Sequence, residues 1–299
     1  MNLSIIIPHY NSVRSLKRLL DTIVMNENVQ TIVVDDKSDW KTGEWEAITA
    51  GYPHVEFYQN GTDKKGAGTC RNIGLVHAVG EWILFADADD YFTDGFYEIV
   101  KEYFRSDSDI VFFMSTSIYE ETGESATRHV FFADRINNYL AVPNKKNELI
   151  LRYEYEGPCS RMVRRSLIAD NGIVFQEVRY SNDVMFSMKT AFYAKKITAD
   201  PRVLYVITQN KTSLTATINP ESTITRLNVF VDKVRFLKEN LSAGEFSLLN
   251  QNGMGWIMYV LKNHRNMKML IYCIRLFRKN KVALFNYRMF TFSYWREKL

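Results

Sequence analysis

The sequence predicts an α/β protein in which a mostly parallel sheet is flanked by helices, followed by a helical C-terminal extension. Over residues 1–100, short apolar, β-branched segments alternate with segments of helical periodicity. Polar clusters follow several of the apolar segments, as expected where parallel strands reach a ligand-binding edge. From Ser222 onward the chain is rich in Leu, Phe, Met and Tyr and reads as helical. A chain of 299 residues has room for one large α/β domain with an appendage, or for two modest domains.

The first half of the chain supplies the clearest elements. Residues 3–7 form an apolar run ended by Pro8, which is typical of a buried strand. Asn11 and Ser12 then precede apolar residues at helical spacing, so the first unit is strand, polar turn and helix. The same reasoning predicts strands at 3–7, 31–34, 55–58 and 82–85, and helices at 13–23 and 69–79, the latter closed by Gly80.

The second half is less regular. Residues 116–147 show no clear period, and we expect an insertion or an acceptor-side loop there. Gly172 is the expected stop of a helix over 161–171. The remaining expected elements are helices at 96–104 and 183–194 and strands at 109–114, 173–175 and 203–207.

The composition narrows the class of protein. With 46% hydrophobic and 24% charged residues the chain is an ordinary globular protein with a core. Its three cysteines are odd in number and far apart, without metal-ligand spacing or a disulfide pattern, which favours a reducing compartment. The N-terminus lacks the basic region of a signal peptide, and no apolar run approaches the roughly 18 residues that span a bilayer. We therefore expect a soluble or peripheral cytoplasmic protein.

Three acids follow the apolar segment 82–85 within four positions: Asp87, Asp89 and Asp90. Unpaired carboxylates are costly in a core, so they should lie at the exit of the strand. Oxygen-only ligands on a short loop suit Mg²⁺ or Mn²⁺ and leave coordination positions for phosphates. The sequence therefore predicts a divalent-metal site at this strand end.

Two other polar clusters should lie on the same edge of the sheet, at residues 8–11 and 35–39. Asp35 and Asp36 could accept hydrogen bonds from a base or a ribose. Arg71 opens the helix after a Gly-rich stretch and can reach phosphate oxygens, with Lys64 and Lys65 nearby. Each acid pair alone is more often a turn or helix cap. Together the clusters favour a nucleoside diphosphate site.

Four segments in this order resemble the family-2 glycosyltransferases. They are SIIIPHYN at 4–11, IVVDDKS at 32–38, AGTCRNIGL at 67–75 and GEWILFADADD at 80–90. The resemblance is close over 3–100 and looser over 157–215. It implies the GT-A fold, which is Rossmann-like, and an enzyme of hexosyltransferase type.

The resemblance also implies roles for individual residues. In the family the first segments hold the nucleotide of the sugar donor, and the D-x-D acids hold a metal that bridges its diphosphate. Carried over, the metal site is Asp87, Asp89 and Asp90, and the donor-binding residues are Pro8, Tyr10, Asp35, Asp36, Arg71, Asp87 and Lys211. His9 lies in the first donor-side turn and could also touch the substrate.

The family's general base is an Asp in a Glu-Asp pair that opens a helix, and Asp183 matches it. Asn182 stands where the family has Glu, which is a departure. Asp183 could instead be a helix cap or first-turn acid. A second departure lies near Ser213, where the family often has Arg or His and this chain offers only Lys211.

The C-terminal region is strongly basic. Residues 262–299 hold ten Lys or Arg and one acid, Glu297, interleaved with aromatic residues. This composition suits an anionic membrane surface or a lipid-linked diphosphate, so 256–299 could make a peripheral membrane contact. It equally suits a helical appendage with solvated charges. The donor motifs argue against nucleic-acid binding.

The leading hypothesis is a metal-dependent inverting glycosyltransferase. It would move a sugar from a nucleotide-sugar, expected to be a UDP-sugar, to a hydroxyl of a saccharide or lipid-linked saccharide during surface polysaccharide assembly. We expect a catalytic domain at 1–215, with the donor half at 1–100 and the acceptor half at 101–215, and a helical region at 216–299. The alternatives are a nucleotide-sugar-binding protein without transferase activity and a nucleotidyltransferase, which would need a Gly-rich loop after the first strand.

Overall fold

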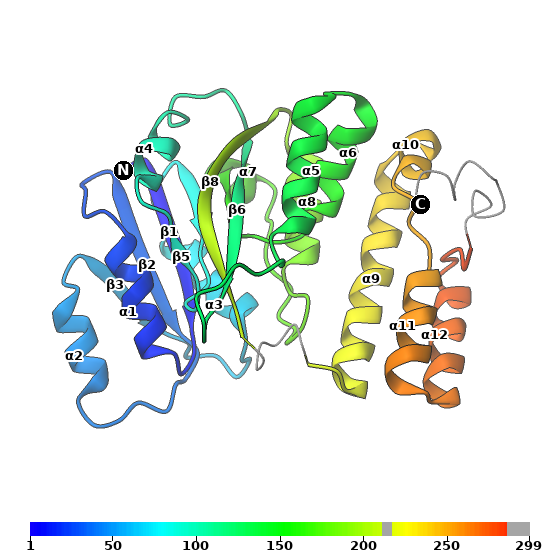
Figure 1. Ribbon diagram of the computed structural model, residues 1–299, viewed down its shortest axis with the longest axis horizontal. Coiled ribbons are helices and arrows are strands. Elements are labelled where there is room, and N and C mark those ends of the chain that lie inside the picture. Colours follow the sequence, from blue (N-terminus) through cyan, green and yellow to red (C-terminus); the bar gives the residue numbers. More distant parts are fainter. Residues whose placement is uncertain (211–216, 286–299) are drawn as a thin grey trace. The chain divides into compact units, whose positions relative to one another are not determined.

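The computed structural model describes residues 1–210 and 217–285, and the chain divides into two compact units, Met1–Ser213 and Leu214–Leu299 (Figure 1). All the strands of the described chain lie in the first unit, and the described regular elements of the second unit are helices. Within the described ranges, none of the helices has the length and apolar character needed to cross a bilayer. The expected donor and acceptor halves of the first unit remain a prediction.

The first unit is built on one sheet with the strand order β3-β2-β1-β4-β7-β6-β8-β5. Six of these strands run in the same direction, and β7 and β5 run against them. The expected mostly parallel sheet is therefore confirmed. The strands are β1 (Leu3–His9), β2 (Val29–Asp35), β3 (Val55–Gln59), β4 (Trp82–Phe85), β5 (Tyr91–Phe92), β6 (Ile110–Tyr119), β7 (Arg161–Arg164) and β8 (Ile197–Gln209).

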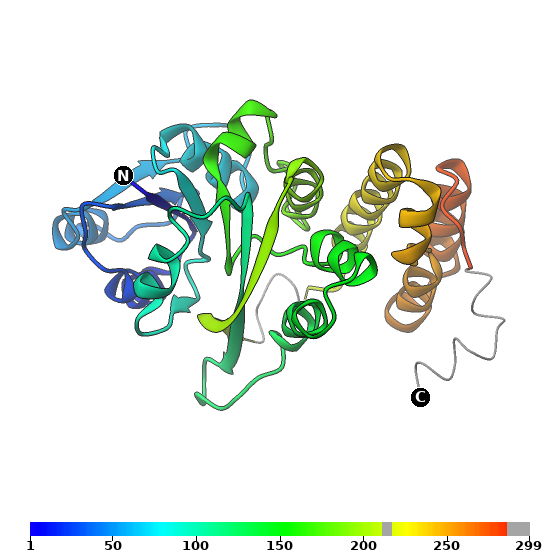
Figure 2. The same cartoon turned by 90° about the horizontal axis from the view of Figure 1, so that it is seen from above.

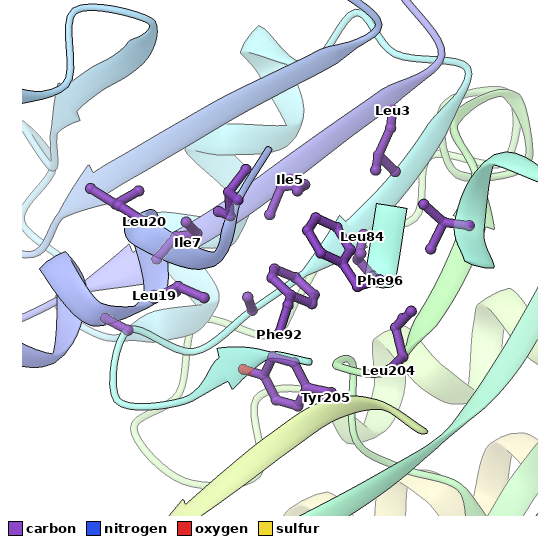
Figure 3. Close-up of a cluster of buried hydrophobic side chains, with 14 of the residues drawn as sticks. Leu3, Ile5, Ile7, Leu19, Leu20, Leu84, Phe92, Phe96, Leu204 and Tyr205 are labelled. Carbon is purple, nitrogen blue, oxygen red and sulfur yellow. The ribbon is translucent and has the colours of Figure 1, made fainter. Parts of the chain in front are cut away.

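Helices cover both faces of the sheet (Figure 2), so the central strands are apolar on both sides. On one face, Ile5 and Ile7 pack with α1, α2 and α4; Figure 3 shows this core, with Leu19 and Leu20 of α1 beside the sheet. On the other face, Ile6 packs with the second set of helices. The first set is α1 (Val13–Thr22), α2 (Glu44–Gly51) and α4 (Phe96–Lys101); the second is α3 (Ala67–His77), α5 (Val130–Ala141), α6 (Lys145–Glu154), α7 (Arg165–Asp170) and α8 (Val184–Tyr193).

Three expectations for the second half of this unit are wrong. Residues 161–164 form β7 instead of the start of a helix, because they pair antiparallel with both β4 and β6 and fill the centre of the sheet. Residues 173–175 are not a strand; they run along α3 in an irregular segment. Residues 116–147 are not a loop, because 116–119 extend β6 and most of the rest forms α5 and the start of α6.

The described part of the second unit, residues 217–285, forms α9 (Pro220–Asn240), α10 (Ala243–Leu248), α11 (Met254–His264) and α12 (Met267–Lys279). A capping box between Asn219 and Ser222 starts α9, with a proline in its first turn. Three helices share the core, which includes Leu227 of α9, Val260 of α11 and Phe277 of α12. The expected helical C-terminal region is therefore present.

Candidate functional site

The three polar clusters do converge on one edge of the sheet. Strands β1, β2 and β4 are parallel neighbours, and His9 pairs with Asp35 while Ile6 pairs with Phe85. The carboxyl ends of all three strands therefore lie together, and the chain leaves each of them in a polar loop. This is the position where open parallel sheets bind ligands.

Asp35, at the end of β2, is buried and fully engaged, with an exposed fraction of 1%. Its carboxylate accepts hydrogen bonds from His9 Nδ1 at 2.9 Å, from the Ser38 amide at 3.0 Å and hydroxyl at 2.5 Å, and from Trp40 Nε1 at 3.1 Å. Burial alone would raise the pKa of Asp35, but these hydrogen bonds outweigh burial and lower it. Asp35 therefore shapes the loop after β2 and has little left to offer a ligand.

His9 is buried behind the edge of the sheet and serves the same loop. Its Nε2 accepts a hydrogen bond from the Ser12 amide at 3.1 Å, so the ring proton resides on Nδ1 and is donated to Asp35. The ring stacks on Trp40 with centroids 5.1 Å apart. Both nitrogens are thus committed to the protein, and the hypothesis that His9 touches substrate finds no free ring atom.

Asp36 ties the Gly-rich loop to β2. Its carboxylate accepts hydrogen bonds from Asn60 Nδ2 and from the Gly66 amide, each at 2.7 Å. Tyr10 lies next to this loop with 51% of its surface exposed, and Lys65 Nζ lies 5.2 Å from the centre of its ring. Tyr10 is therefore free to stack on a ligand, whereas Pro8 is buried in β1 and supplies backbone shape.

The loop after β4 gathers three carboxylates. Asp87, Asp89 and Asp90 place one ligand oxygen each within 4.8 Å of one another. The loop is held from behind, because the Asp87 amide donates to the Tyr205 hydroxyl at 2.8 Å and Asp90 accepts from the Thr208 amide at 2.7 Å.

This acidic group is short of positive partners. Burial and the charge of Asp87 raise the pKa of Asp89 to about 6, and burial with the charges of Asp89 and Asp87 raises the pKa of Asp90 well above its ordinary value. A divalent cation would relieve both. Because the donors are all oxygen and close together, the residues fit Mg²⁺ or Mn²⁺.

Arg71 links the acidic loop to the second half of the unit. Its guanidinium is buried and donates to Asp87 Oδ1 at 2.5 Å and to Asn182 Oδ1 at 2.8 Å. The guanidinium carbon also lies 5.3 Å from the centre of the Phe175 ring. Asn182, the residue that replaces the family's Glu, therefore holds Arg71 as a neutral acceptor.

Asp183 occupies the N-cap position of α8, but its side chain makes no capping hydrogen bond. The cap interpretation therefore does not account for the carboxylate. Burial raises the pKa of Asp183 to about 6, with the charge of Arg71 opposing the rise and that of Glu156 adding to it. A carboxylate of this pKa can take up a proton near neutral pH.

The segment that leads to Asp183 is fastened to α3. Asn72 donates to the Phe175 carbonyl at 3.0 Å and accepts from the Phe175 amide at 2.8 Å. A Cβ atom on Gly68 would lie 2.5 Å from the Gln176 carbonyl oxygen, so the two backbones touch where only glycine fits. The same helix thus positions Arg71 and the approach to Asp183.

Arg161, at the start of β7, is fully buried. In the described ranges no carboxylate lies within ion-pair distance of it; its Nη2 donates to Ser187 Oγ at 2.7 Å, and that hydroxyl donates to the Glu156 carbonyl at 2.5 Å. Burial lowers the pKa of Arg161 to about 10, opposed by the charges of Tyr155 and Asp183. Arg161 is therefore an isolated buried cation behind the first turn of α8.

The structure places the described candidate residues near one edge of the sheet. Arg71 joins Asp87 of the acidic cluster to Asn182, the residue before Asp183, while Asp36 and Tyr10 lie beside the Gly-rich loop that leads into α3. Lys211 lies outside the described residues. Several supporting residues could not be predicted from local pattern, because their partners are distant in the chain: Arg18, Asn60, Arg161, Tyr205 and Thr208.

Comparison with known proteins gives one family match: residues 4–172 match the family described as glycosyl transferase family 2. The chain is 26% identical over 203 residues to the poly(ribitol-phosphate) β-N-acetylglucosaminyltransferase TarS of Staphylococcus aureus, covering 66% of this chain and 34% of that protein. It is 29% identical over 219 residues to a poly(ribitol-phosphate) β-glucosyltransferase of Bacillus spizizenii, covering 69% and 32%. The chain thus spans about a third of the length of these two relatives.

A solved structure agrees on the fold. The crystal structure of S. aureus TarS 1–349 in complex with UDP-GlcNAc superposes with a TM-score of 0.69 and 20% sequence identity, covering 91% of this chain and 79% of that one. At this identity the likeness establishes the architecture alone. The expected GT-A fold is confirmed.

Proposed function

Since the chain belongs to glycosyl transferase family 2, we propose that this glycosyltransferase moves a sugar from a UDP-sugar to an acceptor hydroxyl, with inversion and with the help of a divalent metal. The observation that carries the proposal is the connected set of carboxylates and one cation at the sheet edge. One carboxylate oxygen from each of Asp87, Asp89 and Asp90 lies within 4.8 Å of the others. Asp87 also accepts a hydrogen bond from Arg71. A nucleoside diphosphate and its cation match this pattern of charge.

The donor would lie across the ends of β1, β2 and β4. Tyr10 can stack on the base, with Pro8 fixing the backbone beneath it. Asp36 holds the Gly-rich loop beside the nucleoside, and Asp35 holds the loop after β2 in place. Arg71 faces the diphosphate as a buried cation. Lys211 remains a candidate diphosphate contact on the sequence pattern alone.

The chemical step needs charge stabilisation at the leaving group and a base at the acceptor. Asp87, Asp89 and Asp90 would hold Mn²⁺ or Mg²⁺, which when bound offsets the charge that grows on the departing diphosphate. Asp183 takes the proton of the acceptor hydroxyl as that oxygen attacks the anomeric carbon. The lack of a capping hydrogen bond to its side chain and its pKa of about 6 support this role.

The acceptor would be a saccharide or a lipid-linked saccharide in the assembly of a surface polysaccharide. Two relatives are named for transfer onto poly(ribitol phosphate), so a polyol-phosphate polymer joins the candidates. Residues 101–215 would form the acceptor side, since they contain Asp183. We place the enzyme in the cytoplasm, at the inner face of the membrane where such acceptors are made.

One observation favours a second candidate, a nucleotide-sugar-binding protein without transfer. Asn182 replaces the Glu expected next to the base, so Arg71 keeps a single carboxylate partner, Asp87. A protein of this kind would bind the donor as tightly as an enzyme would, but would not turn it over.

A thermal-shift panel of UDP-, GDP-, TDP- and CMP-sugars, each with and without Mn²⁺, tests the donor and the metal together. We expect the largest rise in Tm from a UDP-sugar with Mn²⁺, and little from either alone. Release of UDP measured with candidate acceptors then separates enzyme from binding protein. Equal shifts from all four nucleotides, or a UDP-sugar shift that EDTA does not reduce, would contradict the proposal.

A further inference from the structure

Helix α12 of the second unit has one face buried and one face exposed. Met269, Cys273 and Phe277 point into the unit's core. The opposite face spans about 140° of the helix circumference at 3.6 residues per turn. It carries exposed cations together with exposed apolar side chains: Met267, Lys268, Ile271, Tyr272, Arg275, Arg278 and Lys279.

Helix α11 repeats this arrangement on a smaller scale. Val260 is buried in the core, while Met258, Leu261 and Lys262 lie exposed on a single stripe. Met258 is 58% exposed, and Met267 of α12 is 66% exposed. We call the exposed residues of the two helices the basic–apolar face. Figure 1 and Figure 2 both draw α11 and α12 as neighbours, joined by a short turn.

The charge of this face is unbalanced. No Asp or Glu occurs between Glu245 and Glu297. Within the described residues, none of the exposed cations on the face is in an ion pair, in contrast to Arg202 and Arg164 of the first unit, which pair with carboxylates. Arg235 of α9 likewise has Asp232 one turn away. The absence of acids is thus a property of α11 and α12, not of the whole unit.

Neither folding nor solubility accounts for this combination. Among the residues that the structure describes, the core of the second unit does not include Met258, Met267 or Ile271, which lie on the far side of their helices. Solubility would favour charges of both signs and fewer exposed apolar side chains. Exposed apolar groups that lie among unpaired cations are typical of a surface that contacts something both anionic and apolar.

We propose that the basic–apolar face docks onto an anionic phospholipid surface. The cations would lie at the level of the lipid phosphates, while Met267, Ile271 and Tyr272 enter the boundary between head groups and acyl chains. This inference stands on the second unit alone and does not depend on the proposed transfer reaction.

A soluble polyanion is the main competitor, and the apolar residues argue against it. Binding to a phosphate polymer would use Lys268, Arg275 and Arg278, but would leave Met267 and Ile271 in water. A bilayer interface is the partner that takes up both kinds of side chain, since it pairs anionic head groups with an apolar interior. A second copy of the same face would bring cations against cations.

Vesicle co-flotation of the full chain tests the proposal. We expect binding to phosphatidylglycerol–phosphatidylcholine vesicles and little binding to pure phosphatidylcholine, with a loss at high salt. The double variant Arg275→Gln/Arg278→Gln should weaken partitioning roughly 30-fold, from about 1 kcal/mol for each cation near an anionic surface. The triple variant Met267→Ser/Ile271→Ser/Tyr272→Ser should weaken it roughly tenfold or more while keeping every charge.

Matched controls separate this surface from general charge and from catalysis. Arg14→Gln/Lys17→Gln removes two exposed cations from α1 of the first unit and should leave partitioning unchanged. Circular dichroism and Tm check that each variant is folded, and donor affinity measured without vesicles should be the same for all of them. A failed donor assay with intact vesicle binding would thus strike only the proposed function.

Three results would overturn the inference. The first is equal binding to neutral and anionic vesicles. The second is wild-type partitioning of the triple variant together with tight binding to a soluble polyphosphate, which would identify a polyanion site. The third is a wild-type protein that floats with neither kind of vesicle but self-associates, and becomes monomeric in the triple variant.

Discussion

Two sets of acids lie at the same edge of one sheet, in opposite states. At the end of β2, Asp35 receives hydrogen bonds from His9, Ser38 and Trp40, and its pKa is lowered. At the end of β4, Asp89 has too few donors for its charge, and its pKa is raised to about 6. The two strands are separated only by β1.

The difference distinguishes acids that hold the loops in place from acids that are available to a ligand or a proton. A carboxylate already satisfied by the protein gains little from a ligand, whereas one left short of donors favours a cation or a proton. Asp183 belongs to the second kind, although it lies on α8. Four substitutions can break or sharpen this contrast.

Asp89→Asn should have the largest effect, lowering transfer roughly a thousandfold or more. The variant keeps the shape of the side chain but removes a charge that the metal would need, and with it several kcal/mol of charge stabilisation. Transfer rates with Mn²⁺ and with EDTA measure the loss. Asp94→Asn, an exposed neighbour outside the cluster, should behave as wild type; full activity of Asp89→Asn in EDTA would refute the metal role.

Asp183→Asn should reduce transfer about a hundredfold or more while donor affinity is unchanged, because the base acts on the acceptor alone. In the wild type, the rate should fall as pH drops below about 6, since a protonated Asp183 cannot accept the proton. The pH–rate profile and calorimetry with a UDP-sugar are the measurements. Asp170→Asn, an exposed acid on α7, is the control. If Asp183→Asn keeps the wild-type rate and the acid limb of the pH–rate profile, another residue must be the base.

Asp35→Asn should act on stability, lowering the free energy of unfolding by about 1–3 kcal/mol because an amide faces buried donors. The pKa of Asp35 is lowered in the fold, so its contribution is complete at neutral pH and is lost as pH falls below about 4. Urea unfolding at pH 7 and at pH 3 should therefore show a gap from wild type that narrows in acid. The exposed Asp39→Asn should show little change at either pH; a gap that widens in acid would contradict this interpretation.

Arg161→Met should have the smallest effect, moving the acid limb of the pH–rate profile upward by about half a pH unit to one unit. Loss of the buried cation leaves the charge of Asp183 less favoured. Arg161→Lys should keep the limb in place. Ser187→Ala removes the hydrogen bond but not the charge, so it should slow transfer without moving the limb. An equal shift of the acid limb in Ser187→Ala would show that the hydrogen bond of Arg161, and not its charge, causes the effect.

Local sequence pattern was sufficient to predict the edge of the sheet where the polar clusters meet. The runs that became β1, β2 and β4 are apolar on both faces because helices cover both, and their polar exits are contiguous with them in the chain. The residues expected to make the acidic cluster, Asp87, Asp89 and Asp90, therefore came directly from one short segment.

The errors arise where distant contacts decide. Residues 161–164 were expected to begin a helix. They form a strand because they pair with both β4 and β6, and this strand pairing outweighs local helix propensity. The hydrogen bond between Asp35 and His9 joins residues that are 26 positions apart, so only the fold reveals it; donor binding by Asp35 stays a prediction. The isolation of Arg161 is likewise invisible in the sequence, since it is defined by partners that are absent from its surroundings.

The geometry of the site depends on Gly68 having no side chain. The helix that presents Arg71 touches the backbone of the segment before Asp183 at this residue, where a single methyl group would fall 2.5 Å from a carbonyl oxygen. An alanine there would push α3, which carries Arg71, away from the segment that leads to Asp183. The spacing between Arg71 and Asp183 thus depends on the absence of a side chain at Gly68.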